Sequence, residues 1–233
     1  MADLRKWITQ KSNIEITKVL GRRCNCYLIS KDESHALVDT SVQQEGKILL
    51  DCLNRLNIKN LNFIMLTHSH FDHTGNAHLL QEKFENNIFI HSSEIQFLKE
   101  GYTYLPKGTS LFTKLATNII GNRIMKFQRF PPCKDKVFTE ETCKLPATLK
   151  IQILDTPGHT KGSVSFIIDD EIAIVGDTMV NLIGGKIFPP FADFPELLPK
   201  TWNKLLDTNC SSFLPAHGKE ISRDLLEQMF LKY

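Results

Sequence analysis

The sequence predicts a layered α/β fold. Short apolar runs bounded by turn residues are typical of strands, and they alternate with segments whose apolar residues recur at helical spacing. Strands separated by helices favour packed layers over an all-β fold. The chain has 233 residues, of which 42% are hydrophobic and 23% charged, so a large globular domain can bury a sizeable core.

The N-terminal part of the chain is expected to be rich in strands. Apolar or partly alternating runs predict strands at 13–19, 24–30, 36–38, 63–66 and 88–90. Leu49, Cys52, Leu53 and Leu56 recur at spacings of three and four, which predicts a helix over 43–56. Two more helices are expected, one over 76–84 and one from Ser92 or Ser93 to about Gly101.

The segment 101–142 has a different pattern. It is aromatic, contains the pair Pro131–Pro132, and shows poor periodicity apart from a possible helix over 110–120. A long excursion of this kind inside a compact domain is usually a functional insertion. We therefore predict a single domain over 1–233 with a lid or insertion at 101–142, the alternative being a helical pair that only covers the sheet.

The second half predicts four more strands, at 149–154, 163–168, 172–175 and 213–216. Three polar residues follow these strands at turns, often beside glycine: His159 after Thr-Pro-Gly, Asp177 in Gly-Asp-Thr, and His217 in His-Gly. Ligands of open α/β sheets gather beyond strand ends, where loops converge. These residues are therefore expected to share one site.

A dense cluster of metal-ligand types occupies residues 67–76, Thr-His-Ser-His-Phe-Asp-His-Thr-Gly-Asn. His68, His70, Asp72 and His73 fall within six residues, between an apolar strand and a helix. Imidazole nitrogens and carboxylate oxygens are common ligands of divalent metal ions. The cluster predicts most of a site for two metal ions, which the three later residues would complete.

This inventory also predicts the chemistry. The negative charge of the two carboxylates is smaller than the positive charge of two divalent ions. The surplus positive charge favours a hydroxide that bridges the two ions. A metal ion lowers the pKa of its water from about 15.7 toward about 7, so no serine or cysteine nucleophile is required. Asp72 is expected to orient the hydroxide and accept its proton. Tyr102 or Tyr104 could supply a hydrogen-bond donor, although ordinary packing explains each of them as well.

The remaining reactive side chains are expected to lie outside the site. His35, His78 and His91 are predicted to be surface or packing residues, and Lys161 a solvated turn residue. The six cysteines show no paired zinc-ligand spacing and are expected to be reduced thiols, buried or on the surface.

Charge and hydropathy limit the partners. A net charge of +2 gives no basic face for nucleic acid. The N-terminus lacks the apolar core of a signal peptide, and no run approaches the roughly 20 apolar residues of a membrane span. We therefore expect a cytoplasmic protein with a small-molecule substrate and no nucleic-acid or membrane partner. The sequence leaves the oligomeric state open.

The motifs His-x-His-x-Asp-His, Gly-His-Thr, Gly-Asp-Thr and His-Gly together resemble those of the metallo-β-lactamase-fold hydrolase superfamily, from Asp39 to Gly218. The resemblance implies a four-layer αββα sandwich with the metals at one edge between two sheets. It also implies a role for each matching position. His68, His70 and His159 would hold one metal, Asp72, His73 and His217 the other, Asp177 would bridge both, and Asp39 would support the site from behind.

Departures from subfamily patterns narrow the function that the resemblance implies. In class B β-lactamases that bind zinc through a cysteine, that cysteine occupies the position of Asp177. Asp177 therefore speaks against membership of that group. Di-iron flavoprotein relatives have glutamate at the position of His70, so His70 favours hydrolysis over electron transfer. Glyoxalase II is similar at the metal motifs, including Asp177. Its C-terminal helical domain has no counterpart in the 16 residues after His217, which puts glutathione thioesters as substrate in doubt.

We therefore predict a metal-dependent hydrolase that uses a metal-bridging hydroxide to cleave an ester-like bond, such as a thioester or lactone. The cofactors expected are two divalent ions, zinc first, with iron or manganese compatible with the same ligands. One alternative is a mononuclear iron oxidoreductase like the persulfide dioxygenases, with iron on His68, His159 and Asp177. β-Lactam hydrolysis, phosphodiester hydrolysis and a non-catalytic binding role are further alternatives.

Overall fold

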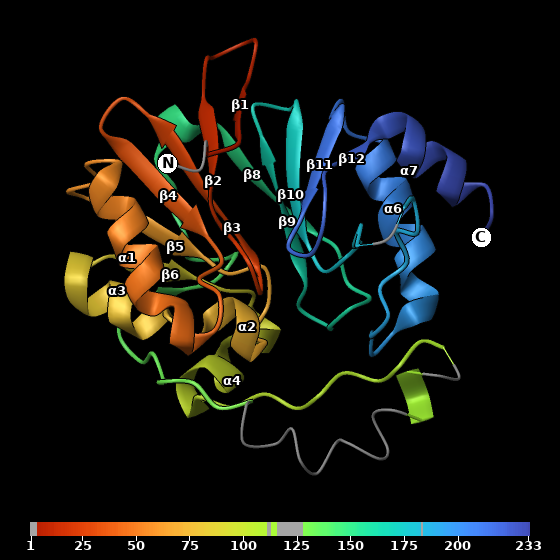
Figure 1. Cartoon of the computed structure of the whole chain (residues 1–233), viewed down its shortest axis with the longest axis horizontal. Coiled ribbons are helices and arrows are strands. Elements are labelled where there is room, and N and C mark those ends of the chain that lie inside the picture. The colour runs from red at the N-terminus through yellow and green to blue at the C-terminus, as the bar shows by residue number, and fades with distance from the viewer. Residues whose placement is uncertain (1–3, 111–112, 116–127, 183) are drawn as a thin grey trace.

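The computed structural model of the chain describes residues 4–110, 113–115, 128–182 and 184–233. Two β-sheets pack face to face, and helices cover the outer face of each sheet (Figure 1). Helices α1 (Gly46–Arg55) and α3 (Ala77–Phe84) lie outside the first sheet, and α6 (Leu198–Leu206) and α7 (Arg223–Phe230) outside the second. The predicted four-layer αββα sandwich is confirmed.

The first sheet has seven strands in the order β1 to β7. Its strands are β1 (Lys6–Ile8), β2 (Glu15–Gly21), β3 (Asn25–Lys31), β4 (Ser34–Val38), β5 (Phe63–Met65), β6 (Asn87–Phe89) and β7 (Val137–Phe138). The first four pair antiparallel, and β4 to β7 pair parallel. Parallel strands need long crossovers, which α1 and α3 supply.

The second sheet has five strands in the order β12-β11-β10-β9-β8. Its strands are β8 (Ile151–Asp155), β9 (Val164–Ile168), β10 (Ile172–Gly176), β11 (Ser212–Pro215) and β12 (Ile221–Ser222). Only β10 and β11 pair parallel, and α6 lies on the crossover between them. Both strands therefore end at the same edge of the sheet.

Three apolar clusters fill the three interfaces between the four layers. Side chains of a strand alternate between its two faces. In β3, Leu28 joins the cluster under α1 and α3, whereas Ile29 joins the cluster between the sheets. In β10, Ile174 faces the first sheet and Val175 packs toward α6 and α7. Both sheets are thus buried on both faces, which explains their nearly continuous apolar strands.

The expected elements appear with small boundary shifts. The helix expected over 43–56 begins as a 3₁₀ turn (Gln43–Glu45) before α1, and the helix expected after Ser92 is the 3₁₀ turn η2 (Ser92–Glu94) followed by α4 (Ile95–Glu100). Three helices are not among the expected elements: the short helix α2 (Phe71–Thr74), α6 and α7.

The segment 101–142 is described only in part. Most of its possible helix over 110–120 lies outside the described residues. Near the other end of the segment, β7 adds an edge strand to the first sheet. Across the described part of the chain, no helix combines the length and apolar character needed to cross a membrane.

Candidate metal centre

The first four donors lie where β5 ends at the middle of the first sheet. After Met65 the chain runs through His68 and His70, and His70 then occupies the N-cap position of α2 in an extended conformation. The single turn of α2 follows and carries Asp72 and His73. The change from extended chain to helix gathers the four donors at one strand end instead of spreading them along a strand.

The other three donors come from the facing edge of the second sheet. His159 lies between β8 and β9, Asp177 follows β10, and His217 follows β11. Gly176 has φ of +52°, and a Cβ there would lie 2.7 Å from the Thr67 side chain. A glycine before Asp177 therefore allows the two sheet edges to approach closely. The structure brings all seven predicted residues together.

The first trio of donors consists of His68, His70 and His159, whose ligand atoms lie within 4.8 Å of one another. His70 Nδ1 lies 2.8 Å from His68 Nε2 and 2.9 Å from His159 Nε2. The three rings meet edge to face, so their nitrogens converge while their planes diverge. This is the arrangement in which three imidazoles can share one cation.

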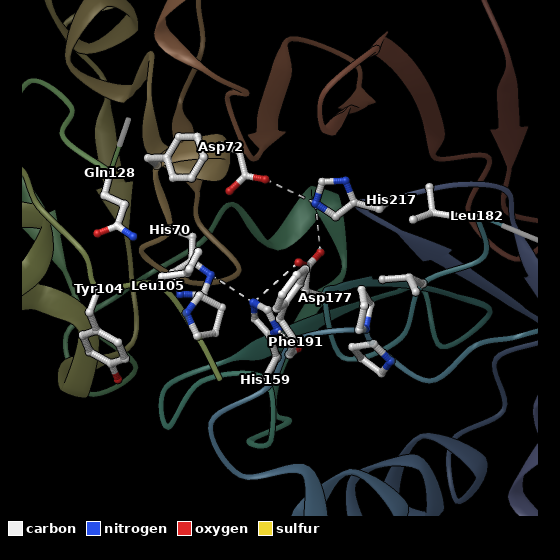
Figure 2. Close-up of a pocket in the computed structure, with 15 residues that line it drawn as sticks. His70, Asp72, Tyr104, Leu105, Gln128, His159, Asp177, Leu182, Phe191 and His217 are labelled. Atoms are coloured by element: carbon white, nitrogen blue, oxygen red, sulfur yellow. Dashed lines mark hydrogen bonds and ion pairs between the residues drawn. The ribbon is translucent and has the colours of Figure 1, made fainter. Parts of the chain in front are cut away.

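The second trio consists of Asp72, His73 and His217, again within 4.8 Å. His217 Nε2 lies 3.4 Å from Asp72 Oδ2, and His73 Nε2 lies 3.9 Å from Asp72 Oδ1. In Figure 2 the Asp72 carboxylate and the His217 ring point toward each other across the mouth of the pocket.

Asp177 lies between the two trios. Its Oδ1 lies 3.4 Å from His217 Nε2 and 3.7 Å from His73 Nε2, whereas its Oδ2 lies 3.5 Å from His159 Nε2. Figure 2 shows the carboxylate turned toward both His159 and His217. One oxygen thus faces each trio.

A divalent cation fits these residues. Within the described ranges, His73 Nε2 and Asp177 Oδ1 are buried and have no hydrogen-bond partner. Buried polar atoms without partners are rare and costly, and here both point into the donor cluster. Nitrogen and carboxylate ligands in this number suit zinc, iron or manganese.

Two histidines of the first trio, His68 and His70, are held neutral. Burial, reinforced by the neighbouring imidazole of His73, keeps the pKa of His68 well below its usual range. Burial lowers the pKa of His70 to about 3, and the nearby His159 adds to this effect. Only a neutral imidazole has a lone pair for a metal ion, so low pKa values suit His68 and His70 for that role.

The second trio and Asp177 attract positive charge. Burial alone would raise the pKa of Asp72 and Asp177, but the imidazoles of His73 and His217 outweigh it and keep both carboxyls below their ordinary values. Burial likewise opposes protonation of His217, yet Asp177 and Asp72 raise its pKa. The carboxylates of Asp72 and Asp177 therefore remain ionised. They face imidazoles that can carry a proton or bind a metal cation in its place.

Asp39 supports the cluster from behind, as expected. Its Oδ2 lies 2.8 Å from His73 Nδ1, and its Oδ1 accepts a hydrogen bond of 2.9 Å from the backbone N–H of Thr67. Cys24 Sγ also lies 3.9 Å from His73 Nδ1. Burial raises the pKa of the Cys24 thiol well above its usual range, and Cys24, Asp39 and His73 form a further group of ligand types beside the two trios.

Glu94 is a supporting residue that sequence analysis missed. It is buried, and its Oε2 accepts hydrogen bonds from the Ser69 backbone N–H at 3.2 Å and from the Ser69 hydroxyl. Its Oε1 accepts a hydrogen bond of 3.1 Å from the Gly162 backbone N–H. Glu94 thus connects the loop of His68 and His70 to the loop of His159. A glutamate in a polar turn carries no signal of this role in the sequence.

The other side chains considered lie away from the donors. His78 forms an ion pair with Glu82 on α3, and His35 contacts Ser30 in the neighbouring strand. His91 lies beside Glu140 and Asp155 outside the cluster. These positions agree with surface or packing roles.

The donors open into a pocket of about 290 Å³ between the two sheet edges. We call it the apolar pocket, because apolar side chains make up most of its described wall besides the donors: Phe71, Tyr104, Leu105, Pro106, Val180, Leu182, Pro189, Pro190 and Phe191. Tyr104 lines it and Tyr102 does not. In Figure 2 the Tyr104 hydroxyl points away from the donors.

Comparison with known proteins decides the family. A sequence profile of the metallo-β-lactamase superfamily matches residues 19–209, most of the chain. The chain belongs to the metallo-β-lactamase superfamily. Together with the donor cluster and metallo-hydrolase relatives, this membership makes it a metallohydrolase of that superfamily.

This superfamily member has curated relatives of similar length. It is similar to hydroxyacylglutathione hydrolase GloC of Haemophilus influenzae, with 31% identity over 88% of this chain and 91% of that protein. It is also similar to a probable metallo-hydrolase of Methanocaldococcus jannaschii, with 28% identity over 85% of this chain and 89% of that protein.

Solved structures share the fold of this superfamily member. An archaeal metallo-β-lactamase superfamily protein from Sulfolobus tokodaii has a TM-score of 0.66 at 18% identity, covering 90% of this chain and 80% of that chain. The BLEG-1 B3 metallo-β-lactamase also has a TM-score of 0.66, at 20% identity, covering 97% of this chain and 95% of that chain.

Proposed function

We propose that the protein is a binuclear metallohydrolase that cleaves an ester-like bond, a thioester first, in a small-molecule substrate. The observation that carries this proposal is the position of Asp177, whose two carboxylate oxygens face two separate trios of donors at the base of an open pocket. A carboxylate with one oxygen toward each trio is suited to bridge two cations.

In this proposal His68, His70 and His159 would hold one ion, Asp72, His73 and His217 would hold the other, and Asp177 would serve both. Two divalent ions, when bound, would activate water as a nucleophile near neutral pH and polarise the attacked carbonyl. Because the pKa values of His68 and His70 are low, both imidazoles are neutral near pH 7. Protons therefore do not compete with a metal ion for their nitrogens.

The residues of the chain have two further tasks. Asp72 lies at the mouth of the pocket and is ionised, so its carboxylate can orient a water molecule and accept its proton. The apolar walls exclude bulk water from the reacting carbonyl, which strengthens the electrostatic effect of the charged groups around it.

Two observations favour hydrolysis of an acyl compound. Among the described residues that line the pocket there is no serine, threonine or cysteine, so water is the available nucleophile. The relative from Haemophilus influenzae is named a hydroxyacylglutathione hydrolase, which denotes cleavage of a thioester. This similarity supports thioesters as the first substrates to test.

The test is metal analysis of the purified protein combined with a panel of thioesters, lactones, phosphodiesters and β-lactams. We expect two zinc equivalents, or two of another divalent metal, and turnover of thioesters or lactones that a chelator abolishes. A single iron, with oxygen uptake on a persulfide substrate, would instead establish the oxidoreductase alternative.

Two substitutions test the ligand assignment. Asp177→Ala is expected to lower the content of both metals and to reduce turnover by at least about 10³-fold. The reason is that the carboxylate between the two trios and its negative charge are lost together. His217→Ala is expected to empty mainly one position. Asp51→Ala and His78→Ala, on the exposed faces of α1 and α3, are the matched controls. Two tightly bound ions in His217→Ala would contradict the assignment.

A further inference from the structure

Two hollows meet at the start of α2. Phe71 and Asp72 line the apolar pocket on one side and, on the other, a second hollow of about 780 Å³. The second hollow is lined by Arg22 and Arg23, from the turn between β2 and β3, and we call it the arginine groove. Because Asp72 belongs to both hollows, a ligand at the donor cluster can extend into each of them.

The apolar pocket is built as a firm extension of the donor cluster. His159 Nδ1 donates a hydrogen bond of 2.8 Å to the carbonyl oxygen of Phe191, which lies in the pocket wall. The wall around Phe191 is tied to the opposite wall, since the Thr109 N–H donates to the Pro190 carbonyl at 3.0 Å and the Ala192 N–H to the Lys107 carbonyl at 2.8 Å. The two apolar walls are therefore fixed relative to His159.

The lining of this pocket selects an apolar group. Apart from the donors, the polar side chains on the described wall are Gln128 and Tyr104. The Tyr104 hydroxyl points away from the donors. Leu182 is 64% exposed at the rim, and an apolar ligand would cover it. A polar group in this pocket would lose hydration and find few partners, which disfavours it.

The arginine groove has the opposite character. Arg22 and Arg23 are both exposed, and Arg22 Nε lies 3.7 Å from the buried carboxylate of Glu45. Glu45 also accepts a hydrogen bond of 2.7 Å from Ser41 Oγ. Arg23 makes no ion pair with any residue in the described ranges. Glu45 and Asp72 also line the groove, so the positive charge open to a ligand is that of the exposed Arg23 guanidinium and of the weakly paired Arg22.

We propose that the substrate is an anionic acyl thioester or ester. Its apolar acyl group occupies the apolar pocket, and its anionic leaving half, which carries phosphate or carboxylate groups, lies along the arginine groove. This inference rests on the proposed hydrolase function and specifies its substrate class. The scissile carbonyl would then lie at Asp72, where the two hollows meet.

The reaction in this arrangement needs only water as co-reactant. The oxygen of water forms a bond to the acyl carbon, and the carbon–sulfur bond breaks. One proton of the water passes to Asp72 and then to the departing thiolate, so the products are a carboxylic acid and a thiol. The arginines would hold the anionic thiol half, and the apolar walls would hold the acid.

The first experiment compares thioesters of one acyl group on three thiols, using the metal-loaded protein. Coenzyme A supplies phosphates, glutathione supplies carboxylates, and N-acetylcysteamine is uncharged. We expect kcat/KM to be at least about tenfold higher for an anionic thiol than for the uncharged one, and the difference to shrink with added salt. The better of the two anionic thiols identifies the anion that the groove prefers.

The second experiment tests the arginines. Arg22→Ala/Arg23→Ala is expected to lower the ratio of kcat/KM between the anionic and uncharged thioesters by roughly tenfold, mainly through KM. Arg55→Ala, which removes an exposed arginine at the end of α1, is the control and should leave the ratio unchanged. An unchanged ratio in the double variant would overturn the assignment of the groove.

The third experiment tests the apolar pocket. Each methylene added to the acyl chain is expected to raise kcat/KM about threefold to fourfold until the pocket is filled. Leu182→Ser should weaken this dependence, whereas Leu231→Ser, on an exposed leucine near the C-terminus, should not. A preference for short polar acyl groups would contradict the proposal.

The outcomes separate the inference from the function on which it rests. Hydrolysis of charged and uncharged thioesters with equal kcat/KM would refute the inference and leave the hydrolase function intact. Failure to hydrolyse any thioester or ester by the metal-loaded protein would refute both.

Discussion

In three of the buried histidines, the contact made by one ring nitrogen determines where the other nitrogen points. His73 Nδ1 contacts Asp39, His159 Nδ1 donates to the Phe191 carbonyl, and His68 Nδ1 lies 3.1 Å from Thr67 Oγ1. Each contact uses the ring nitrogen that faces away from the cluster. The remaining nitrogen, Nε2 in all three rings, is therefore directed into the donor cluster.

Asp39→Asn is predicted to weaken binding of the ion that His73 would hold. An amide in place of the carboxylate presents N–H groups or a weaker acceptor to His73 Nδ1, so the ring loses its orienting contact. Asp39 has φ of +58°, which asparagine also tolerates, so the backbone should be preserved. We expect a ten- to hundredfold loss of metal affinity, measured by competition with a chelator. Unchanged affinity for both ions would contradict the supporting role of Asp39.

Glu94→Gln is predicted to weaken the trio formed by His68, His70 and His159. Whichever way the amide is placed, a backbone N–H of Ser69 or Gly162 loses its acceptor. The expected cost is about 1–3 kcal/mol in the free energy of unfolding, with a metal affinity lowered about tenfold.

The measurements for this variant are urea unfolding of the metal-free protein and chelator competition. Glu82→Gln, an exposed glutamate on α3, is the control. If Glu94→Gln lost stability while both ions stayed bound as in the original protein, Glu94 would act on the fold alone and not on the donors.

Among the elements, the turn between β9 and β10 connects the two sheets. The Ser12 N–H and hydroxyl each donate a hydrogen bond of 2.8 Å to the carboxylate of Asp169. Glu171 accepts hydrogen bonds from the Gln10 and Lys11 N–H groups at 2.7 and 2.8 Å. Two carboxylates of the second sheet thus bind three consecutive backbone N–H groups in the loop between β1 and β2.

Asp169→Asn is predicted to remove a pH-dependent part of the stability. Burial opposes ionisation of Asp169, but hydrogen bonds from Thr9 and Ser12 outweigh it and hold the pKa of the carboxyl below its ordinary value. A carboxyl whose folded pKa is depressed stabilises the fold fully above its ordinary pKa, and this contribution is lost as the pH falls through the folded pKa. The difference in unfolding free energy between the two proteins should be about 1–2 kcal/mol at neutral pH and shrink toward pH 3.

Urea unfolding of metal-free samples at several pH values measures this difference without interference from metal loss. The backbone of Asp169 has φ of +54°, which asparagine accepts, so strain is not expected to contribute. A difference that stayed constant with pH would show that the charge of Asp169 is not the stabilising feature.

Elements with strong local patterns could be predicted, and those defined by distant contacts could not. The spacing of Leu49, Cys52 and Leu53 marks α1, and all three are buried. The strands β1 and β7 have three and two residues and form only because a neighbouring strand pairs with them. Helix α6 does carry a local signal, since Leu198, Trp202 and Leu205 are buried at spacings of four and three.

At the scale of the whole molecule, the donor cluster joins the two halves of the sandwich. His68, His70, Asp72 and His73 belong to the first sheet, and the other three donors to the second. The Asn25 amide and the Tyr27 hydroxyl each donate a hydrogen bond of 2.8 Å to the Pro215 carbonyl, so β3 also positions the strand that leads to His217. Bound ions would act as additional connections between the sheets.

Metal removal is therefore predicted to lower the thermal stability of the whole fold. Each ion that binds the folded chain at a hundredfold excess over Kd contributes about 2.7 kcal/mol, so in a chain of this size removal of two ions by a chelator should lower Tm by roughly 10–20 °C. Differential scanning calorimetry with and without chelator measures the effect. In Asp177→Ala the chelator should have much less effect, and an equal shift in both proteins would contradict metal binding at this cluster.

The donors could be predicted because they are short polar motifs placed directly after apolar strands. The seven predicted side chains do converge, although they extend from His68 to His217. Arg22, Glu94 and Phe191 could not be assigned in advance. Their positions beside the cluster depend on how the turns and loops of both sheets pack, and no local pattern encodes that packing.

The order of the strands has a consequence for synthesis of the chain on the ribosome. Strand β11 lies between β10 and β12 and ends two residues before His217, so the second sheet stays incomplete until the chain has emerged through Ser222. The motif at 68–73 emerges much earlier, at a translation rate of about 5–20 residues per second. For several seconds a nascent chain therefore exposes a partial chelating motif, and any ion captured then must be retained or exchanged when the final strand docks.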